Sequence, residues 1–559
     1  MTSMAKSLLV VMTLGLTSTI AQAQSWTKKA AKSVLTVKTF GADGTLIGSS
    51  AGFFVSDDGV AVSSFAPFRG AARAVVIDAQ GNESAVVCML GANDTYDLAK
   101  FRTDSRKTSA LPVGTRAAEG AEVWLLPYRE QKQLPQGTVR KAESIADDYV
   151  YYTVAIAATE GMETVGCPLL NANGEVIGLM QSAANPNDTL TYAVDVTMAT
   201  ALKITGLSIN DKTLRSTTIK KALPDELDQA NLTLYVAGAS MDSLSYTQLV
   251  EEFIAKFPDA PDGYTYRAEC EAGAGDFAAA ARDMEKAIGK AEKKDEAHFN
   301  YARLIYQKEI YHSQQPFADW SLDRAYSEAE EARRTNDEPV YRHLQAQIRY
   351  AQQRYGDAAD LYATLMNSTL RSADIFYEAS RCQAMLRDTT SQLALLDSAV
   401  AIFNRPYLKE AAPYILARAQ ARLDAGRFRE AVFDLNDYET LIATGLTERF
   451  YYLRHQAEVG GRLFKQALDD IDRAISMKPE EEFYYSEKAS LQLRVGLYDE
   501  AMATAKECIR LEPDISDGYL FLGLAQCLKG QKDEGLKNLQ KAKEKGDGQA
   551  DALIEKYAK

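Results

Sequence analysis

The sequence predicts a multidomain protein in which an all-β domain is followed by a long all-α array. Its length of 559 residues is several times what one compact core holds, so more than one folded part is expected. Short apolar runs separated by turn residues fill the chain up to about residue 205, whereas Ala, Leu, Glu and Arg recur at helical spacing after about residue 240. With 46% hydrophobic and 25% charged residues, the composition is that of folded globular domains.

The first 23 residues have the pattern of a secretory signal peptide. Lys6 precedes the apolar run Leu8–Leu16, and Ala21-Gln22-Ala23 provides a small-residue cleavage signal. The run is too short to cross a bilayer, and no later stretch of about 18 apolar residues predicts a transmembrane segment. We therefore expect an exported protein, in the periplasm first of all, with an extracellular or outer-membrane-associated location as the alternative.

Residues 24–205 have the pattern of an all-β barrel or sandwich. Turn signals such as Asp57-Asp58-Gly59 and Asn173-Gly174 separate the apolar runs at near-regular intervals. Residues 206–240 have neither pattern and are assigned only as a linker or adapter. The runs predicted as strands are Ser33–Phe40, Ser50–Val55, Ala74–Ile77, Ala85–Leu90, Val123–Leu126 and Tyr151–Ile156.

The helical region, residues 241–559, repeats with a period of about 34. A small residue recurs once per period, and a second small residue follows twelve positions later in most units. Turns with Gly before an aromatic residue, such as Gly426-Arg-Phe428 and Gly496-Leu-Tyr498, separate the two positions. One longer step suits an insertion of about ten residues around Tyr311–Trp320. The first small positions are Ala268, Ala302, Ala346, Ala379, Ala419, Ala489 and Gly523, with His455 as the exception.

These phased positions resemble the tetratricopeptide repeat, which implies an all-α superhelix of helix pairs with a polar cap at its end. Such a superhelix presents a face lined by the first helix of each pair, suited to holding a peptide or a protein surface. Tyrosine and arginine are favoured at protein interfaces, although the same side chains can simply pack between neighbouring helices. The candidate peptide-binding residues are Tyr451, Tyr452, Arg454, Tyr484, Tyr485 and Tyr519.

The β region resembles the trypsin-like serine proteases, especially the bacterial high-temperature-requirement type. Three blocks match in order: Ser50–Ser64, Asp94–Ala99 and Glu163–Leu170, with a weaker match at Tyr192–Asp195. In that family the first block leads to the catalytic histidine, the second carries the triad aspartate, and the third contains the nucleophilic serine. The resemblance implies a trypsin-like double β-barrel.

Two of the three catalytic positions do not transfer. Aligning Gly59-Val-Ala-Val-Ser-Ser-Phe-Ala66 with the family motif places Ala66 at the histidine, and Val165 lies at the serine. Only Asp97 remains, and Glu163 replaces an oxyanion-hole glycine. Catalysis needs a nucleophile, a base bonded to it and oxyanion donors. We therefore interpret Asp97 as a hydrogen-bonded structural carboxylate rather than one that orients an imidazole.

The distribution of histidines makes this conclusion independent of the alignment. All four histidines lie in the repeat region, the first of them at position 298, so the protease-like region contains no histidine to act as general base. Cys167 as nucleophile, or a serine with a lysine base, would be alternative chemistry. The histidines and the six scattered cysteines show no metal-ligand spacing, so neither a metal nor another cofactor is predicted.

The favoured function is an exported, non-catalytic scaffold or adaptor that binds other exported or envelope proteins. A net charge of −14 disfavours nucleic acid as a partner. One alternative is a serine-type endopeptidase with a non-standard site whose repeats recruit substrate. A carbohydrate or ligand receptor is the third hypothesis, with little support from only three tryptophans.

Overall fold

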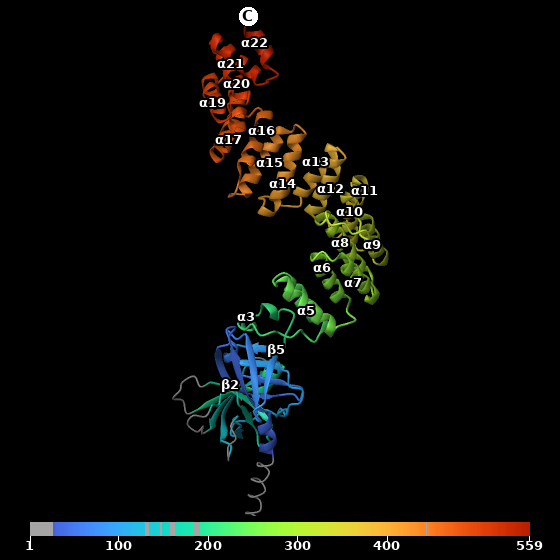
Figure 1. The fold of residues 1–559 in the computed structure, drawn as a ribbon, viewed down its shortest axis with the longest axis vertical. Helices are drawn as coiled ribbons and strands as arrows, with labels where there is room; N and C mark the ends of the chain where they lie inside the picture. The colour runs from blue at the N-terminus through green and yellow to red at the C-terminus, as the bar shows by residue number, and fades with distance from the viewer. Residues whose placement is uncertain are drawn as a thin grey trace, which may run out of the picture. The chain divides into compact units, whose positions relative to one another are not determined.

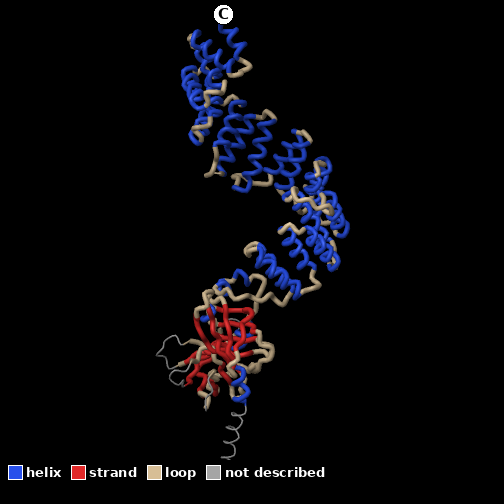
Figure 2. Tube along the Cα trace, in the orientation of Figure 1, coloured by secondary structure: helices blue, strands red, loops and turns tan. Residues whose placement is uncertain are grey.

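The chain divides into two compact units, Met1–Ala274 and Gly275–Lys559. The structure is a computed structural model that describes residues 26–128, 133–145, 148–156, 163–182, 190–442 and 444–558. The strands lie in the first unit and the second unit is helical (Figures 1 and 2). The predicted signal peptide, residues 1–23, lies outside the described residues. Among the described helices, none has the length and apolar composition that crossing a bilayer requires.

Twelve described strands form two closed six-stranded antiparallel barrels. The first has the order β1-β2-β3-β6-β5-β4 and the second β10-β11-β12-β9-β8-β7. This confirms the predicted all-β double barrel. The strands are β1 (Val34–Phe40), β2 (Leu46–Phe54), β3 (Val60–Ser63), β4 (Arg73–Asp78), β5 (Glu83–Asn93), β6 (Leu98–Thr103), β7 (Glu122–Leu125), β8 (Gln136–Ser144), β9 (Val150–Ile156), β10 (Pro168–Leu170), β11 (Val176–Met180) and β12 (Thr191–Asp195).

Alternation along the strands fills each barrel. In β9, Tyr152, Val154 and Ile156 point into the core of the second barrel while the residues between them are half-buried. The turn between β2 and β3 depends on Gly59, which has a φ of +91° and whose added Cβ would lie 2.6 Å from the Ser105 carbonyl oxygen. The predicted turn at this position is therefore present and requires glycine.

The segment assigned as a linker or adapter packs on the first barrel. Met89 of β5 accepts from the Ala222 N–H and donates to the Lys220 carbonyl, at 3.0 and 2.7 Å. Ile219 is buried in the core of that barrel, and the Thr217 hydroxyl donates to the Ala71 carbonyl at 2.8 Å. The short elements here are α2 (Val196–Ala201), η4 (Ser208–Asn210) and α3 (Lys212–Arg215).

Helices begin before residue 241. The helix α4 (Leu227–Gly238) precedes α5 (Ser243–Lys256) and α6 (Pro261–Gly273), which complete the first unit. Sequence reasoning missed α4 because its stretch lacks the phased small residues and the turn with Gly before an aromatic residue. Tertiary packing forms it instead, since Ala230 and Leu234 share a core with Val250 and Phe253 of α5.

The second unit consists of successive helices. From α8 to α21, each helix packs against the next helix in the chain, as the repeat period predicts (Figure 1). The helices are α7 (Phe277–Lys290), α8 (Asp295–Tyr311), α9 (Leu322–Thr335), α10 (Pro339–Ala351), α11 (Tyr355–Leu365), α12 (Ala373–Met385), α13 (Thr389–Val400), α14 (Ala412–Asp424), α15 (Phe428–Leu441), α16 (Glu448–Gly460), α17 (Phe464–Met477), α18 (Glu482–Arg494), α19 (Tyr498–Leu511), α20 (Asp517–Leu528), α21 (Lys532–Glu544) and α22 (Ala550–Ala558).

Close packing at the small positions holds each pair together. Gly523 of α20 and Gly535 of α21 face each other, and a Cβ added to Gly523 would lie 2.9 Å from the Gly535 carbonyl oxygen. At the exceptional unit, the buried His455 ring places Nδ1 2.8 Å from the Ala467 carbonyl oxygen. Where α16 and α17 cross, a side-chain hydrogen bond thus takes the place of the close backbone contact that a small residue allows.

The predicted insertion lies between α8 and α9 and is anchored by an aromatic cluster. Trp320 is buried, and its Nε1 donates to the Tyr301 hydroxyl at 3.1 Å. Its ring packs on Phe277 and Phe317, with centroids 5.6 and 5.5 Å away. The longer step in the repeat period is thus a packed extension of one helix pair.

Candidate functional site

Asp97 occupies the triad aspartate position, and both of its carboxylate oxygens are engaged. It follows β5 and immediately precedes β6, while Ser64 to Ala66 leave the end of β3. Oδ1 accepts the Ala66 backbone N–H at 2.6 Å, and Oδ2 accepts the Ser64 hydroxyl. The Asp97 carbonyl also accepts the Phe65 N–H, at 3.2 Å. The carboxylate therefore fixes the turn that contains the histidine position.

These bonds engage both oxygens of the carboxylate. In the resemblance to serine proteases, the aspartate binds a histidine ring; here the backbone N–H of Ala66 and the hydroxyl of Ser64 donate to it. Ala66 is exposed and its methyl group offers neither acid nor base, whereas Ser64 is buried. Asp97 itself has a φ of +49°, a conformation that Asp tolerates better than most residues. The structural role of Asp97 stays an interpretation, tested below.

Val165 lies in the turn before β10 and contacts the first barrel. Its carbonyl accepts the Ala51 N–H at 3.2 Å, and the Ala51 carbonyl accepts the Ser63 hydroxyl at 2.7 Å. Gly166, with a φ of +82°, has no room for a Cβ, which would lie 2.1 Å from the Ala51 carbonyl oxygen. Through β2 and the end of β3, the structure thus joins Val165 to the turn of Ala66 and Asp97. We call Ala66, Asp97 and Val165 the triad positions.

Cys167, the alternative nucleophile, is fully buried beside Val165. Its Sγ lies 3.5 Å from the Glu163 carbonyl oxygen. Burial raises the pKa of this thiol to about 12, chiefly because a thiolate would be desolvated there. Since the thiolate is the reactive form, this raised pKa opposes a nucleophilic role for Cys167 at neutral pH.

The lysines that burial perturbs in the first unit donate to main-chain carbonyls. Lys100 Nζ donates to Thr200 and Leu202 at 2.5 and 3.0 Å, and Lys221 Nζ donates to Thr217 at 2.5 Å. Burial lowers the pKa of both ammonium groups. Neither bond joins a lysine to a serine hydroxyl, as a serine–lysine mechanism would require.

The repeat candidates fall into two groups. Arg454 is 5% exposed, and its guanidinium donates to Asp470, Glu439 and Asn436. Tyr484 is also buried, against Tyr452 and Ile471. For Arg454 and Tyr484 the packing alternative therefore describes the structure, because interior ion pairs and ring contacts take up their side chains.

The other tyrosines are half-exposed. Tyr452 packs on Phe483, with ring centroids 5.1 Å apart, and accepts from the Gln456 amide at 3.0 Å. Tyr485 donates to the Pro479 carbonyl at 3.1 Å. The Tyr519 ring lies 5.6 Å from the ammonium group of Lys541 in α21 and 5.7 Å from that of Lys545, which follows this helix. Tyr451 packs at right angles on Phe450. These four keep surface that a partner can reach.

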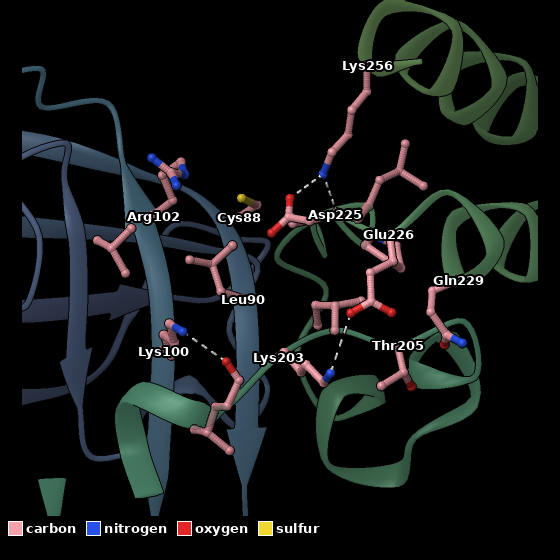
Figure 3. A pocket seen from close by; sticks show the side chains of 16 residues that line it. Cys88, Leu90, Lys100, Arg102, Lys203, Thr205, Asp225, Glu226, Gln229 and Lys256 are labelled. Atoms are coloured by element: carbon pink, nitrogen blue, oxygen red, sulfur yellow. Dashed lines mark hydrogen bonds and ion pairs between the residues drawn. The ribbon is translucent and has the colours of Figure 1, made fainter. Parts of the chain in front are cut away.

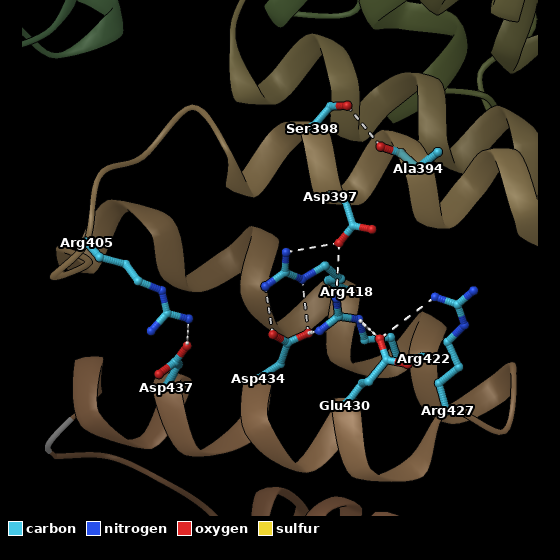
Figure 4. Close-up of polar contacts among 10 residues, drawn as sticks. All are labelled: Ala394, Asp397, Ser398, Arg405, Arg418, Arg422, Arg427, Glu430, Asp434 and Asp437. Atoms are coloured by element: carbon cyan, nitrogen blue, oxygen red, sulfur yellow. Dashed lines mark hydrogen bonds and ion pairs between the residues drawn. The ribbon is translucent and has the colours of Figure 1, made fainter.

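A charged cluster that sequence reasoning missed lies one unit before Arg454. Arg418 and Arg422 of α14 both point toward Asp434 of α15, and both reach Asp397 of α13 (Figure 4). The sequence did contain a signal for this cluster. Arg418 and Arg454 each stand immediately before the first small position of their unit, which is exceptionally a histidine after Arg454, and each has an aspartate sixteen residues later. Among the described residues, no group of three or more His, Cys, Asp or Glu side chains is arranged to hold a metal ion.

Comparison with known proteins gives two family matches. The family described as "Trypsin-like peptidase domain" matches residues 50–179, and the family described as "Tetratricopeptide repeat" matches residues 246–295. The chain therefore combines a trypsin-like domain with tetratricopeptide repeats.

Individual relatives cover only parts of the chain. The small glutamine-rich tetratricopeptide repeat-containing protein 2 of Saccharomyces cerevisiae is 27% identical over 95 residues, which are 17% of this chain and 28% of that protein. The match thus spans little more than a quarter of that relative. A crystal structure of a serine endoprotease from Yersinia pestis is 19% identical, covers 35% of this chain and 66% of that chain, and has a TM-score of 0.28.

The trypsin-like match includes positions 66, 97 and 165, which the resemblance predicts to be the triad positions. Ala66 and Val165 carry hydrocarbon side chains, and the whole domain lacks histidine. The family match thus describes how the domain folds, and its activity is a separate question.

Proposed function

We propose that the protein is an exported, non-catalytic scaffold in which a protease-like barrel pair and a repeat array bind different proteins. One observation carries the proposal: the carboxylate at Asp97 accepts from Ala66 and Ser64 in a domain that has no histidine. A serine-type mechanism needs a base between carboxylate and nucleophile, and here both base and nucleophile are replaced by groups that cannot transfer protons.

The same geometry supports a binding role for the barrels. Around the triad positions the strands, the turn at Asp97 and the loop at Val165 are held by backbone hydrogen bonds although the catalytic side chains are gone. We infer that this junction receives an extended segment of a partner and holds it by main-chain hydrogen bonds. The partners in this proposal are other exported or envelope proteins, and the place of action is the periplasm.

The repeats provide the second binding surface. The half-exposed Tyr451, Tyr452, Tyr485 and Tyr519 lie on the first helices of three successive units, where large amphipathic rings suit a protein interface. Arg454 is not part of this surface, since its donors bind carboxylates inside the array.

A direct assay separates the scaffold from the alternative, an endopeptidase with a non-standard site. The purified chain without residues 1–23 is incubated with unfolded casein and with a fluorophosphonate probe. We expect neither cleavage nor labelling. A Cys167→Ala variant is run in parallel. Cleavage that depends on Cys167 would show that this buried thiol is reactive after all. Reproducible cleavage by the unaltered chain, blocked by the probe, would overturn the proposal itself.

Partner binding is tested with a photo-crosslinking amino acid placed at single positions of the full chain in cells. Ala66 reports on the barrel junction and Tyr519 on the repeats, while the exposed Gly289 serves as the matched control. We expect different crosslinked proteins at Ala66 and Tyr519, both above the Gly289 background. The same background at all three positions would contradict the division of labour.

A further inference from the structure

A pocket of about 490 Å³ lies in the first unit (Figure 3), and none of the triad positions is among the residues that line it. One wall is formed by β5 and β6 of the first barrel, and the other by the chain after α2, the segment leading into α4 and the end of α5. Nothing in the proposed scaffold mechanism uses this pocket. Its volume is that of more than ten water molecules, so it has room for a small organic molecule.

Four basic side chains line the pocket: Lys100 and Arg102 on β6, Lys203 after α2, and Lys256 at the end of α5. Lys100 and Arg102 are two residues apart on β6, so their side chains leave the same face of the strand. Burial is the main cause that lowers the pKa of Lys100; the Asp225 carboxylate opposes it, and repulsion by Arg102 adds a smaller lowering. An anion between them would relieve this repulsion.

Both β6 cations keep donors beyond their internal bonds. Lys100 donates to two carbonyls, of Thr200 and Leu202, whereas an ammonium group has three hydrogens. Within the described residues, Arg102 donates to Asp58 through Nη1 alone, at 2.8 Å to the carboxylate. Its Nε and Nη2 therefore remain as a pair of parallel donors, the arrangement that binds carboxylate and phosphate oxygens with two bonds.

The acids of the pocket are at its rim. Asp225 pairs with Lys256 at 2.7 Å, but its side chain is 99% exposed. Glu226 is 3.8 Å from Lys203, and both of these side chains are about 70% exposed. Exposed pairs of this kind contribute little and exchange partners readily, so they do not compete strongly with a bound anion. Leu90, Leu202 and Pro224 add apolar surface between the charges.

From this arrangement we propose that the pocket between the first barrel and the α4–α5 segment binds a small organic anion with at least two negative charges and an apolar portion. Arg102 and Lys100 hold one anionic group against the barrel wall, and Lys203 and Lys256 hold the other from the helical side. Because the ligand contacts both walls, its binding also fastens α4 and α5 to the barrel. Carboxylate and phosphate groups share this chemistry.

The test uses the full chain without residues 1–23 in calorimetric titrations at fixed low ionic strength. The probes are terephthalate and 1,4-phenylene bisphosphate, which carry two anionic groups on an apolar ring and distinguish carboxylates from phosphate esters, and benzyl alcohol is the uncharged control. We expect saturable binding of at least one anion and none of the alcohol, together with a rise in the melting temperature that grows with anion concentration.

Two variants locate the site. Arg102→Gln and Lys203→Gln should each weaken anion binding by about tenfold, the effect of losing one charge-assisted contact. The matched control Lys212→Gln removes an exposed lysine of α3 in the same unit, outside the pocket, and should leave affinity unchanged. No binding of either anion at 10 mM, with the chain folded by circular dichroism, would overturn the proposal. So would equal weakening by Lys212→Gln, which would indicate non-specific attraction.

Discussion

Arg418 donates from Nε and Nη2 to the two carboxylate oxygens of Asp434, at 3.0 and 2.7 Å. The same fork recurs one unit later, where Arg454 donates to Asp470 from the same two nitrogens. Each pair joins the two helices of one repeat, and each arginine also reaches back to an acid of the preceding unit, Asp397 or Glu439. These arginines thus fix both the pairing within a unit and the stacking between units.

Arg454→Ala should destabilise the array strongly. It leaves Asp470, itself almost fully buried, without its two principal donors, and removing one partner of a buried pair costs about 3–5 kcal/mol. The free energy of unfolding is measured by urea denaturation followed by circular dichroism.

The exposed pair of Arg510 and Glu507 on α19 provides the control. Both side chains are about half exposed, so Arg510→Ala should change stability by no more than about 0.5 kcal/mol. If Arg454→Ala lowered the free energy of unfolding no more than Arg510→Ala, the interior pair of Arg454 and Asp470 would not contribute to stability. The double replacement Arg454→Met with Asp470→Leu should recover most of the loss, because no charge is then left buried.

Much of the architecture could be predicted because it depends on local patterns. The turn at Gly59 and the alternation in β9 are encoded within a few residues, and the repeat period is encoded by small side chains at helix crossings. By contrast, α4 depends on packing against the following helix α5, and the docking of residues 217–222 on β5 depends on contacts between segments far apart in sequence. No local pattern distinguishes such a segment from a linker.

The candidate site divides in the same way. The residue types at Ala66 and Val165 and the lack of histidine in the protease-like region can be read directly from the sequence, whereas their assignment as triad positions stays a prediction. Whether Arg454 faces a partner or the interior depends on the carboxylates around it, which come from two other helices. Its burial could have been suspected only from the sixteen-residue spacing shared with Arg418 and Asp434.

Gly523→Ala should weaken the last repeat. The new methyl group would lie 2.9 Å from both the Gly535 carbonyl oxygen and a side-chain carbon of Leu539, so the two helices must separate. Overpacking of this kind costs about 1–3 kcal/mol. Gly289→Ala on α7 is the matched control, because it meets nothing within 4 Å and should stabilise by about 0.5–1 kcal/mol. Opposite signs are expected in thermal melts; equal signs would contradict close packing at Gly523.

Asp97→Ala should destabilise the barrels by about 1–3 kcal/mol, because the buried Ser64 hydroxyl and the Ala66 N–H lose their acceptor. Asp97→Asn should be much milder, since the amide oxygen still accepts from Ala66 and Asn tolerates the positive φ. Urea denaturation of both variants checks the order. If Asp97→Asn were as damaging as Asp97→Ala, the carboxylate charge itself would be essential, and its assignment as an ordinary structural acceptor would be wrong.

Glu458 predicts that the stability of the array decreases as the pH rises. Burial, with Asp470 nearby, raises the pKa of this carboxyl group to about 8 in the folded chain, from an ordinary value of 4.5. Between these pH values the folded state holds a proton that the unfolded state has released, so the free energy of unfolding falls as pH rises from about 4.5 to about 8 and then levels off. Glu458→Gln keeps the neutral form at every pH. It should therefore raise the melting temperature at pH 8.5 by at least a few degrees and change it little at pH 5. Glu507→Gln, at an exposed site of α19, should show no such pH-dependent gain. An equal effect of Glu458→Gln at both pH values would mean that this carboxyl group ionises alike in the folded and unfolded chain.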